Sequence, residues 1–298
     1  MIVDASPSAY VFEVQEPKIV FDLEKVKKVY ENYTVNAHAG LTLVMGHPFK
    51  NEGFCEQIRK EQQAILQVFQ AHGLEDALML YDVDSQVHAT LIELASQHDL
   101  GSNEQRLLKE EELLTSAKTQ KPIDINFTAR WIKKTPSFEI EVGAGVLSHD
   151  HRDQTLRITD TGQIVMKGRA KERALLSEIR EEFEKEAGIV HKYGKSDDEF
   201  FFVIGYVKSD ARLLDPTFAF DLAKCIEERR PDIQLALKVD RVKVILYQNY
   251  SLDSNACVFE SKEFKLKEEL DLPGQNLVEH VKQVISERSL LFELPEAA

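Results

Sequence analysis

His88 and Thr90 have the residue types and the spacing for chemistry on a phosphate group. Both lie in residues 87–94, an apolar segment after a turn that is predicted to be a β-strand. In a strand, side chains at positions i and i+2 point to the same face. An imidazole can move a proton near neutral pH, and a hydroxyl can donate a hydrogen bond to a phosphoryl oxygen. The pair therefore predicts one half of a site for phosphodiester cleavage.

In-line cleavage of a phosphodiester also requires a second group, so that one acts as base and the other as acid. His38 lies just before the first predicted strand and could face the site, although a capping or surface histidine is the simpler interpretation. His149 and His151 lie beside Asp150 and Asp153. That cluster could bind a metal, but a solvated hairpin loop is the simpler interpretation. The other histidines show no motif and are expected on the surface or in loops: His47, His72, His98, His191 and His280.

Other common kinds of site have no motif in this chain. There is no phosphate-binding glycine loop, dinucleotide fingerprint, nucleophile elbow or His-Glu-x-x-His zinc motif. The three cysteines, Cys55, Cys225 and Cys257, are too far apart for a Cys-x-x-Cys motif and are predicted to be structural core thiols. No cofactor and no metal are therefore expected.

Composition is that of a globular protein, with 43% hydrophobic and 30% charged residues in a chain of 298. The formal net charge of -14 repels polyanions, so extended duplex nucleic acid is not expected as a partner. A nucleotide or a short RNA end could still bind in a local cleft. No apolar run is long enough to span a bilayer, and the first residues do not resemble a secretory signal. We expect a cytoplasmic protein that does not bind membranes.

The elements around His88 follow an order that the second half of the chain repeats. In the first half, we predict strands at 39–45, 77–81 and 87–94 and helices at 22–30, 52–72 and 103–117. The second half is predicted to contain strands at 123–132, 138–147, 156–159, 163–166, 199–207, 239–247 and 258–264, and helices at 171–187, 218–229 and 276–288. This predicts an α+β fold of two pseudo-symmetric lobes, each an antiparallel sheet covered by helices. Residues 36–265 would form this domain, with an N-terminal extension at 1–35 and a C-terminal helical extension at 266–298.

The layout resembles that of the 2H phosphoesterase superfamily, the LigT-like group of 2',3'-cyclic-nucleotide phosphodiesterases once described as 2',5' RNA ligases. The resemblance covers roughly residues 36–265. It rests on the order of several segments: the strand from Gly40, the His88-x-Thr90 motif, the strand from Phe138 that ends in glycines, the helix beginning near Ala174 and the strand from Val242.

The resemblance implies a metal-independent site with two facing His-x-Thr/Ser motifs, in which one histidine acts as base and the other as acid. Here the second pair falls at Phe201 and Val203, which cannot move a proton. Shifting the alignment places only Phe200 or Phe202 there. Two hypotheses follow. The chain is an enzyme that acts on a cyclic phosphate or a 2',5'-linked nucleotide through His88 and Thr90, or it is a non-catalytic module that binds a nucleotide, an RNA end or a protein.

Overall fold

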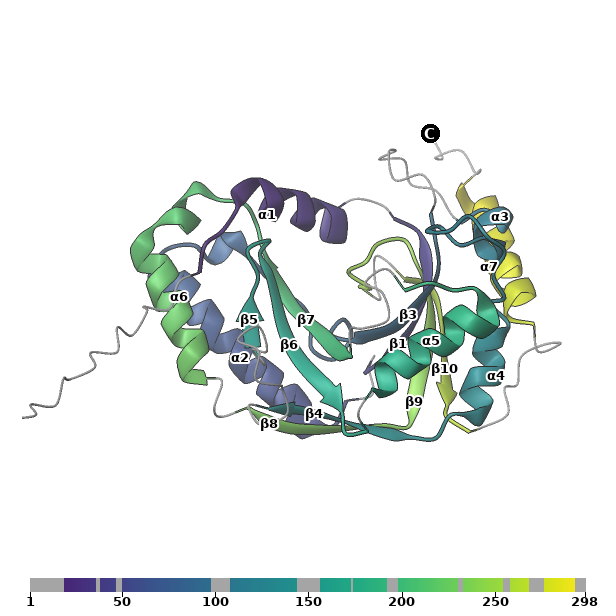
Figure 1. The fold of residues 1–298 in the computed structure, drawn as a ribbon. Coiled ribbons are helices and arrows are strands. Elements are labelled where there is room, and N and C mark those ends of the chain that lie inside the picture. Colours follow the sequence, from purple (N-terminus) through teal and green to yellow (C-terminus); the bar gives the residue numbers. More distant parts are fainter. Residues whose placement is uncertain are drawn as a thin grey trace, which may run out of the picture.

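Two antiparallel sheets lie side by side, each covered by helices, and form two lobes (Figure 1). The structure, a computed structural model, describes residues 19–35, 38–46, 50–97, 108–143, 156–172, 174–191, 198–229, 233–253, 258–267 and 276–292. The two helix-covered sheets confirm the α+β class with two lobes that the sequence predicts.

The first sheet has the strand order β10-β9-β1-β3 and lies on the right in Figure 1. It consists of β1 (Gly40–Met45), β3 (Ala89–Ser96), β9 (Arg241–Tyr247) and β10 (Val258–Lys265). All its pairings are antiparallel. The strand that begins immediately after His88 is an edge strand of this sheet.

The second sheet has the order β2-β7-β6-β4-β8, and β5 pairs with β6 beside this path. Its strands are β2 (Leu78–Leu80), β4 (Phe138–Gly143), β5 (Leu156–Ile158), β6 (Gln163–Ala170), β7 (Glu199–Val207) and β8 (Gln234–Val239). The strand β7 carries Phe201 and Val203 and corresponds to β3, since each lies next to the strand that precedes a long helix in the chain.

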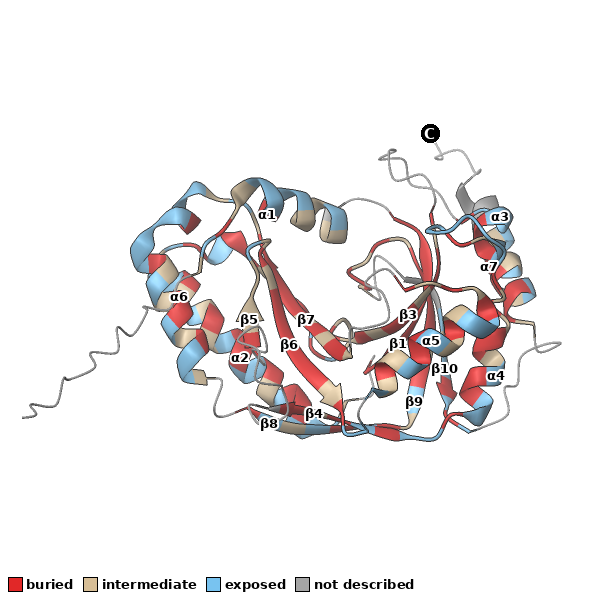
Figure 2. Ribbon diagram, viewed as in Figure 1, coloured by how far each residue is buried: buried red, intermediate tan, exposed pale blue. Residues whose placement is uncertain are grey.

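The long helices cross between the lobes. Helix α2 (Glu52–Ala71) follows β1 of the first sheet but packs on the second sheet and on α6 (Pro216–Arg229). Helix α5 (Leu175–Ala187) follows β6 of the second sheet but packs on β3 and on α4 (Phe127–Lys134). Each sheet is thus covered by a long helix that follows a strand of the other sheet in the chain. One large apolar core spans both lobes (Figure 2).

The described residues of α1 and α7, which lie outside residues 36–265, pack onto this same core. Val26 of α1 (Leu23–Tyr30) is fully buried near β7, and Val281 of α7 (Leu277–Phe292) is buried near the first sheet. A π-helical turn (Glu31–Val35) continues α1. The remaining short helices are α3 (Glu110–Leu114) and the 3-10 turns Glu75–Ala77 and Ala211–Leu214.

The predicted strand at residues 123–132 is wrong, because residues 127–134 form α4. Phe127 and Trp131 are four residues apart and pack on Phe183 of α5, with ring centroids 5.1 and 5.6 Å away. A run of apolar residues fits both a strand and a buried helix, and here packing decided between them.

Strand β8 was missed because most of its side chains are polar or partly exposed. Of the helix predicted at 103–117, the described residues form only the short helix α3, Glu110–Leu114.

Lys50 links the end of β1 to the residue before His88 through its side-chain ammonium. Its ammonium donates hydrogen bonds to the carbonyls of Gly46 and Val87, the latter at 2.7 Å. Burial lowers the pKa of Lys50 from 10.5 to about 8.

The stability of the protein is expected to depend on pH through Lys50. Between pH 8 and 10.5, Lys50 loses its proton in the folded state but keeps it in the unfolded state, so the free energy of unfolding should rise with pH over this range. Urea unfolding of wild type and Lys50→Met at pH 8 and pH 10 measures this, with Lys50→Met as the reference for all other groups. A difference between the two proteins that stays constant with pH would contradict the assignment.

Candidate functional site

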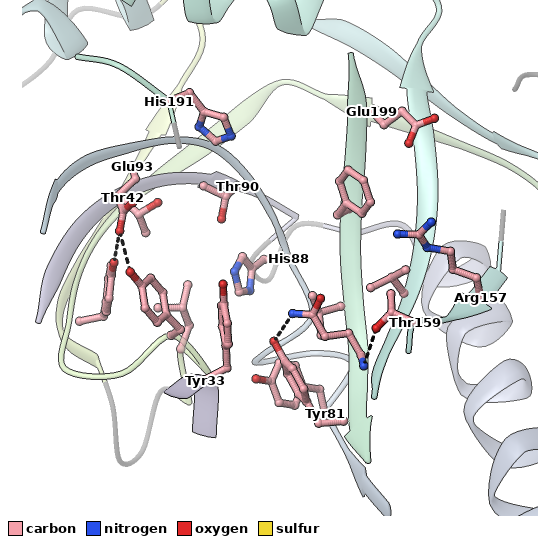
Figure 3. A pocket seen from close by; sticks show the side chains of 18 of the residues that line it. Tyr33, Thr42, Tyr81, His88, Thr90, Glu93, Arg157, Thr159, His191 and Glu199 are labelled. Atoms are coloured by element: carbon pink, nitrogen blue, oxygen red, sulfur yellow. Dashed lines mark hydrogen bonds between the residues drawn. The ribbon is translucent and has the colours of Figure 1, made fainter. Parts of the chain in front are cut away.

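A cavity of about 480 Å³ lies between the two sheets, with walls from both lobes (Figure 3). This volume is in the range of small-molecule sites. The side chains that line it come mostly from the central strands and from the loops beside them: Tyr33, Thr42, Tyr81, His88, Thr90, Glu93, Arg157, Thr159, Gln163, Val165, Arg180, His191, Glu199, Phe201, Val203, Tyr206, Tyr247, Tyr250 and Leu252.

His88 and Thr90 both line the cavity. Their neighbours Val87, Ala89 and Leu91 have no exposed surface and point into the core, as the alternation of a strand requires. The Nδ1 atom of His88 donates a hydrogen bond to the carbonyl of Gln86 at 2.6 Å. This contact makes Nε2 the basic nitrogen of the neutral ring and leaves it as the atom that can take up a proton.

Strand β7 lines the same cavity through Glu199, Phe201 and Val203. The residues between them, Phe200 and Phe202, are buried in the core. Phe201 and Val203, where the family resemblance places the second motif, therefore line the same cavity as His88 and Thr90. The structure brings all four positions together, with an aromatic and an aliphatic side chain in the second pair.

A β-bulge follows the motif in both strands. In β3, the pairing with β1 shifts after Thr90, and in β7 the pairing with β6 shifts after Val203. Each bulge inserts one residue, so the next side chain to line the cavity is three positions on, which is Glu93 in β3 and Tyr206 in β7. Sequence analysis missed both residues because simple alternation points them away from the site. Gly205 lies at the bulge in β7 and is the one sequence signal for it, whereas β3 has no glycine or proline at its bulge.

Glu93 accepts two tyrosine hydroxyls at one end of the cavity. The Oη atoms of Tyr247 and Tyr250 donate to Glu93 Oε1 at 2.9 and 3.2 Å (Figure 3). Burial raises the pKa of both hydroxyls well above the usual range, and the charge of Glu93 raises them further. The tyrosines therefore stay protonated and act as donors to the carboxylate.

Tyrosine rings form much of the cavity wall. Tyr33 lies 5.0 Å from Tyr250 and 6.0 Å from Tyr206, and Tyr81 lies 5.6 Å from Tyr206, between ring centroids. His38 stacks on Tyr250 at 4.6 Å but is not itself part of the lining. It therefore packs against this wall at Tyr250. An aromatic wall of this kind suits the face of a ring or a cation.

Basic side chains from the second sheet border the other end. Glu199 is paired with Lys167 at 2.5 Å and with Arg169 at 3.2 Å, so its charge is compensated. Lys167 also lies 5.1 Å from the ring centroid of Phe201. Arg157 of β5 lines the cavity, and its buried Nε has no hydrogen-bond partner among the residues that the structure describes. These groups favour an anionic ligand here.

His191 also lines the cavity, from the loop after α5, and only 5% of its surface is exposed. The sequence placed it on the surface or in a loop. It is a loop residue, but folding brings it into the same cavity as His88. No spacing in the sequence could have indicated this. The predicted candidates His149 and His151 lie outside the described residues. Within the described ranges, no three side chains of the metal-binding types gather to hold a metal ion.

Comparison with known proteins gives no functional assignment. No family model matches the chain, and no curated protein is similar to it in sequence. Among solved structures, a conserved protein of unknown function from Agrobacterium tumefaciens is similar, with 14% identity and a TM-score of 0.47 over 84% of this chain and 100% of that one. None of the helices in the described residues is long and apolar enough to cross a membrane.

Replacing Glu199 should destabilise the protein strongly. Glu199→Gln leaves the buried Lys167 charge poorly compensated, and breaking such a pair typically costs about 3–5 kcal/mol. Chemical denaturation measures the loss. Glu139→Gln is the control, because it removes an exposed ion pair with Lys171 in the same sheet and should leave stability nearly unchanged. Equal effects of the two variants would show that the Glu199 pair is not the strong contact that its burial indicates.

Proposed function

We propose that this protein is a diverged 2H phosphoesterase-like protein that binds a nucleotide phosphoester in the cavity and cleaves it slowly through His88 and Thr90. One observation carries the proposal. The spacing His88, Thr90, Glu93 is repeated as Phe201, Val203, Tyr206, and both sets line one cavity. This repetition supports a site of two facing motifs in which one motif has been replaced.

The geometry supports a simple division of roles. Thr90 would donate to a phosphoryl oxygen, and Arg157 would attract the phosphate charge. His88 Nε2 would take the proton of the attacking water or hydroxyl as its oxygen bonds to phosphorus, and the ester oxygen would leave with a proton from the medium or from another cavity group. Since Phe201 cannot supply that proton, cleavage would be slow.

A second candidate function is binding without cleavage. Phe201 and the tyrosines offer faces on which a nucleobase can stack, and stacking needs no proton transfer. The replacement of both members of the second pair favours this alternative. A binding protein of this kind would hold a nucleotide, an RNA end or the side chains of a protein partner in the same cavity.

Hydrolysis assays with 2',3'-cyclic nucleotides and 2',5'-linked dinucleotides test the proposal. We expect slow turnover by wild type and a loss of about 10²–10⁴-fold in His88→Ala, the usual effect of removing a positioned acid or base. Turnover that is rapid in wild type and equal in His88→Ala would contradict the role of His88. Nucleotide binding without any turnover would favour the non-catalytic function.

Restoring the second motif is the complementary experiment. Phe201→His combined with Val203→Thr places an imidazole and a hydroxyl where the cavity now has apolar groups. If the positions are equivalent to those of a second motif, turnover should rise by about 10²-fold. Phe200→His with Phe202→Thr is the matched control, because these residues point into the core and the change should unfold the protein without any gain in activity. No gain from a folded Phe201→His, Val203→Thr variant would argue against the equivalence.

A further inference from the structure

The Glu93 carboxylate has no cationic partner within the part of the chain that the structure describes. Among the described residues its partners are the hydroxyls of Tyr247 and Tyr250, and both donate to Oε1. Glu199, which lines the same cavity, has both Lys167 and Arg169. A charge that is partly removed from water is costly unless an opposite charge or several donors compensate it. The Oε2 atom of Glu93 is therefore placed to accept a contact from a ligand.

The surroundings of Glu93 are suited to a positively charged or electropositive group. Tyr33, Tyr247 and Tyr250 are neighbours, with centroid distances of 5.0 Å for Tyr33 to Tyr250 and 5.4 Å for Tyr247 to Tyr250. The faces of aromatic rings attract cations, and most strongly where water is excluded. A carboxylate among tyrosine rings combines both attractions in one place. An anionic group at this end would instead be repelled by Glu93.

Arg157 gives the cavity the opposite charge at its other end. It comes from β5 of the second lobe, and the described residues provide it with no ion pair. In Figure 3, His88 and Thr90 lie between Glu93 on one side and Arg157 on the other. The cavity thus has a negative end and a positive end, with the proposed reactive pair between them.

We infer that the ligand is a phosphoester whose organic part carries an electropositive nitrogen, which sits against Glu93 and the tyrosines while the phosphate faces His88, Thr90 and Arg157. This inference rests on the proposed function and specifies its substrate class. An alkylammonium group and the exocyclic amine of a nucleobase both have the required chemistry, since each presents positive charge or N–H dipoles to a carboxylate.

Two matched pairs of probes test the inference and distinguish the two sources. Phosphocholine is compared with 3,3-dimethylbutyl phosphate, which has the same shape without the positive charge. Cytidine 2',3'-cyclic phosphate is compared with uridine 2',3'-cyclic phosphate, which has a carbonyl in place of the amine. Calorimetric titration gives the affinity of each probe for wild type and for Glu93→Gln, with Glu139→Gln as the control variant outside the cavity.

We expect wild type to prefer the nitrogen-bearing member of at least one pair by about tenfold, and Glu93→Gln to lose that preference while Glu139→Gln keeps it. The comparison within each pair on wild type remains informative even if Glu93→Gln does not fold. Equal affinity within both pairs, or a preference that persists in Glu93→Gln, would overturn the inference. If uridine cyclic phosphate is bound and cleaved as well as the cytidine compound and phosphocholine does not bind, the inference fails and the proposed function stands. If none of the four probes binds, both fail.

Discussion

The whole site depends on the two-residue alternation of β3 and β7 and on the bulge that interrupts it at the same place in each. Alternation sends His88 and Thr90 to the cavity and Val87 and Ala89 to the core, and β7 divides its residues in the same way. A shift of one residue in β3 would place the apolar Ala89 and Leu91 in the cavity and the polar Thr90 in the core. The apolar core therefore fixes which side chains meet the ligand.

The sequence predicted well what depends on local periodicity. Most strands and helices and the shared face of His88 and Thr90 follow from spacing along single elements, although the strand predicted at 123–132 is helix α4 and β8 was missed. The second pair at Phe201 and Val203 was located by the family resemblance, not by spacing. The sequence could not predict contacts made only by folding. Helix α4 needed Phe183 from a distant helix, and His191 reaches the cavity from a loop.

The two β-bulges combine a local feature of the strand with a contact that only folding makes. The side chains of Glu93 and Tyr206 enter the cavity because the pairing registers of two strands shift, and a register is a property of the sheet rather than of one strand. The repeated spacing could be recognised only once both strands were seen in one structure. The bulge in β3 brings the Glu93 carboxylate into the cavity and so makes one end of the cavity negative.

The crossing of α2 and α5 between the lobes sets how the cavity can respond to a ligand. Because each sheet is covered by a helix attached to the other, the lobes cannot swing apart as rigid bodies without exposing the shared core. Hinge closure, by which many two-lobed proteins adapt to ligands of different size, is therefore costly here. The fold therefore holds the width of the cavity nearly fixed. We expect the size of a ligand to limit its binding as strictly as its charge does.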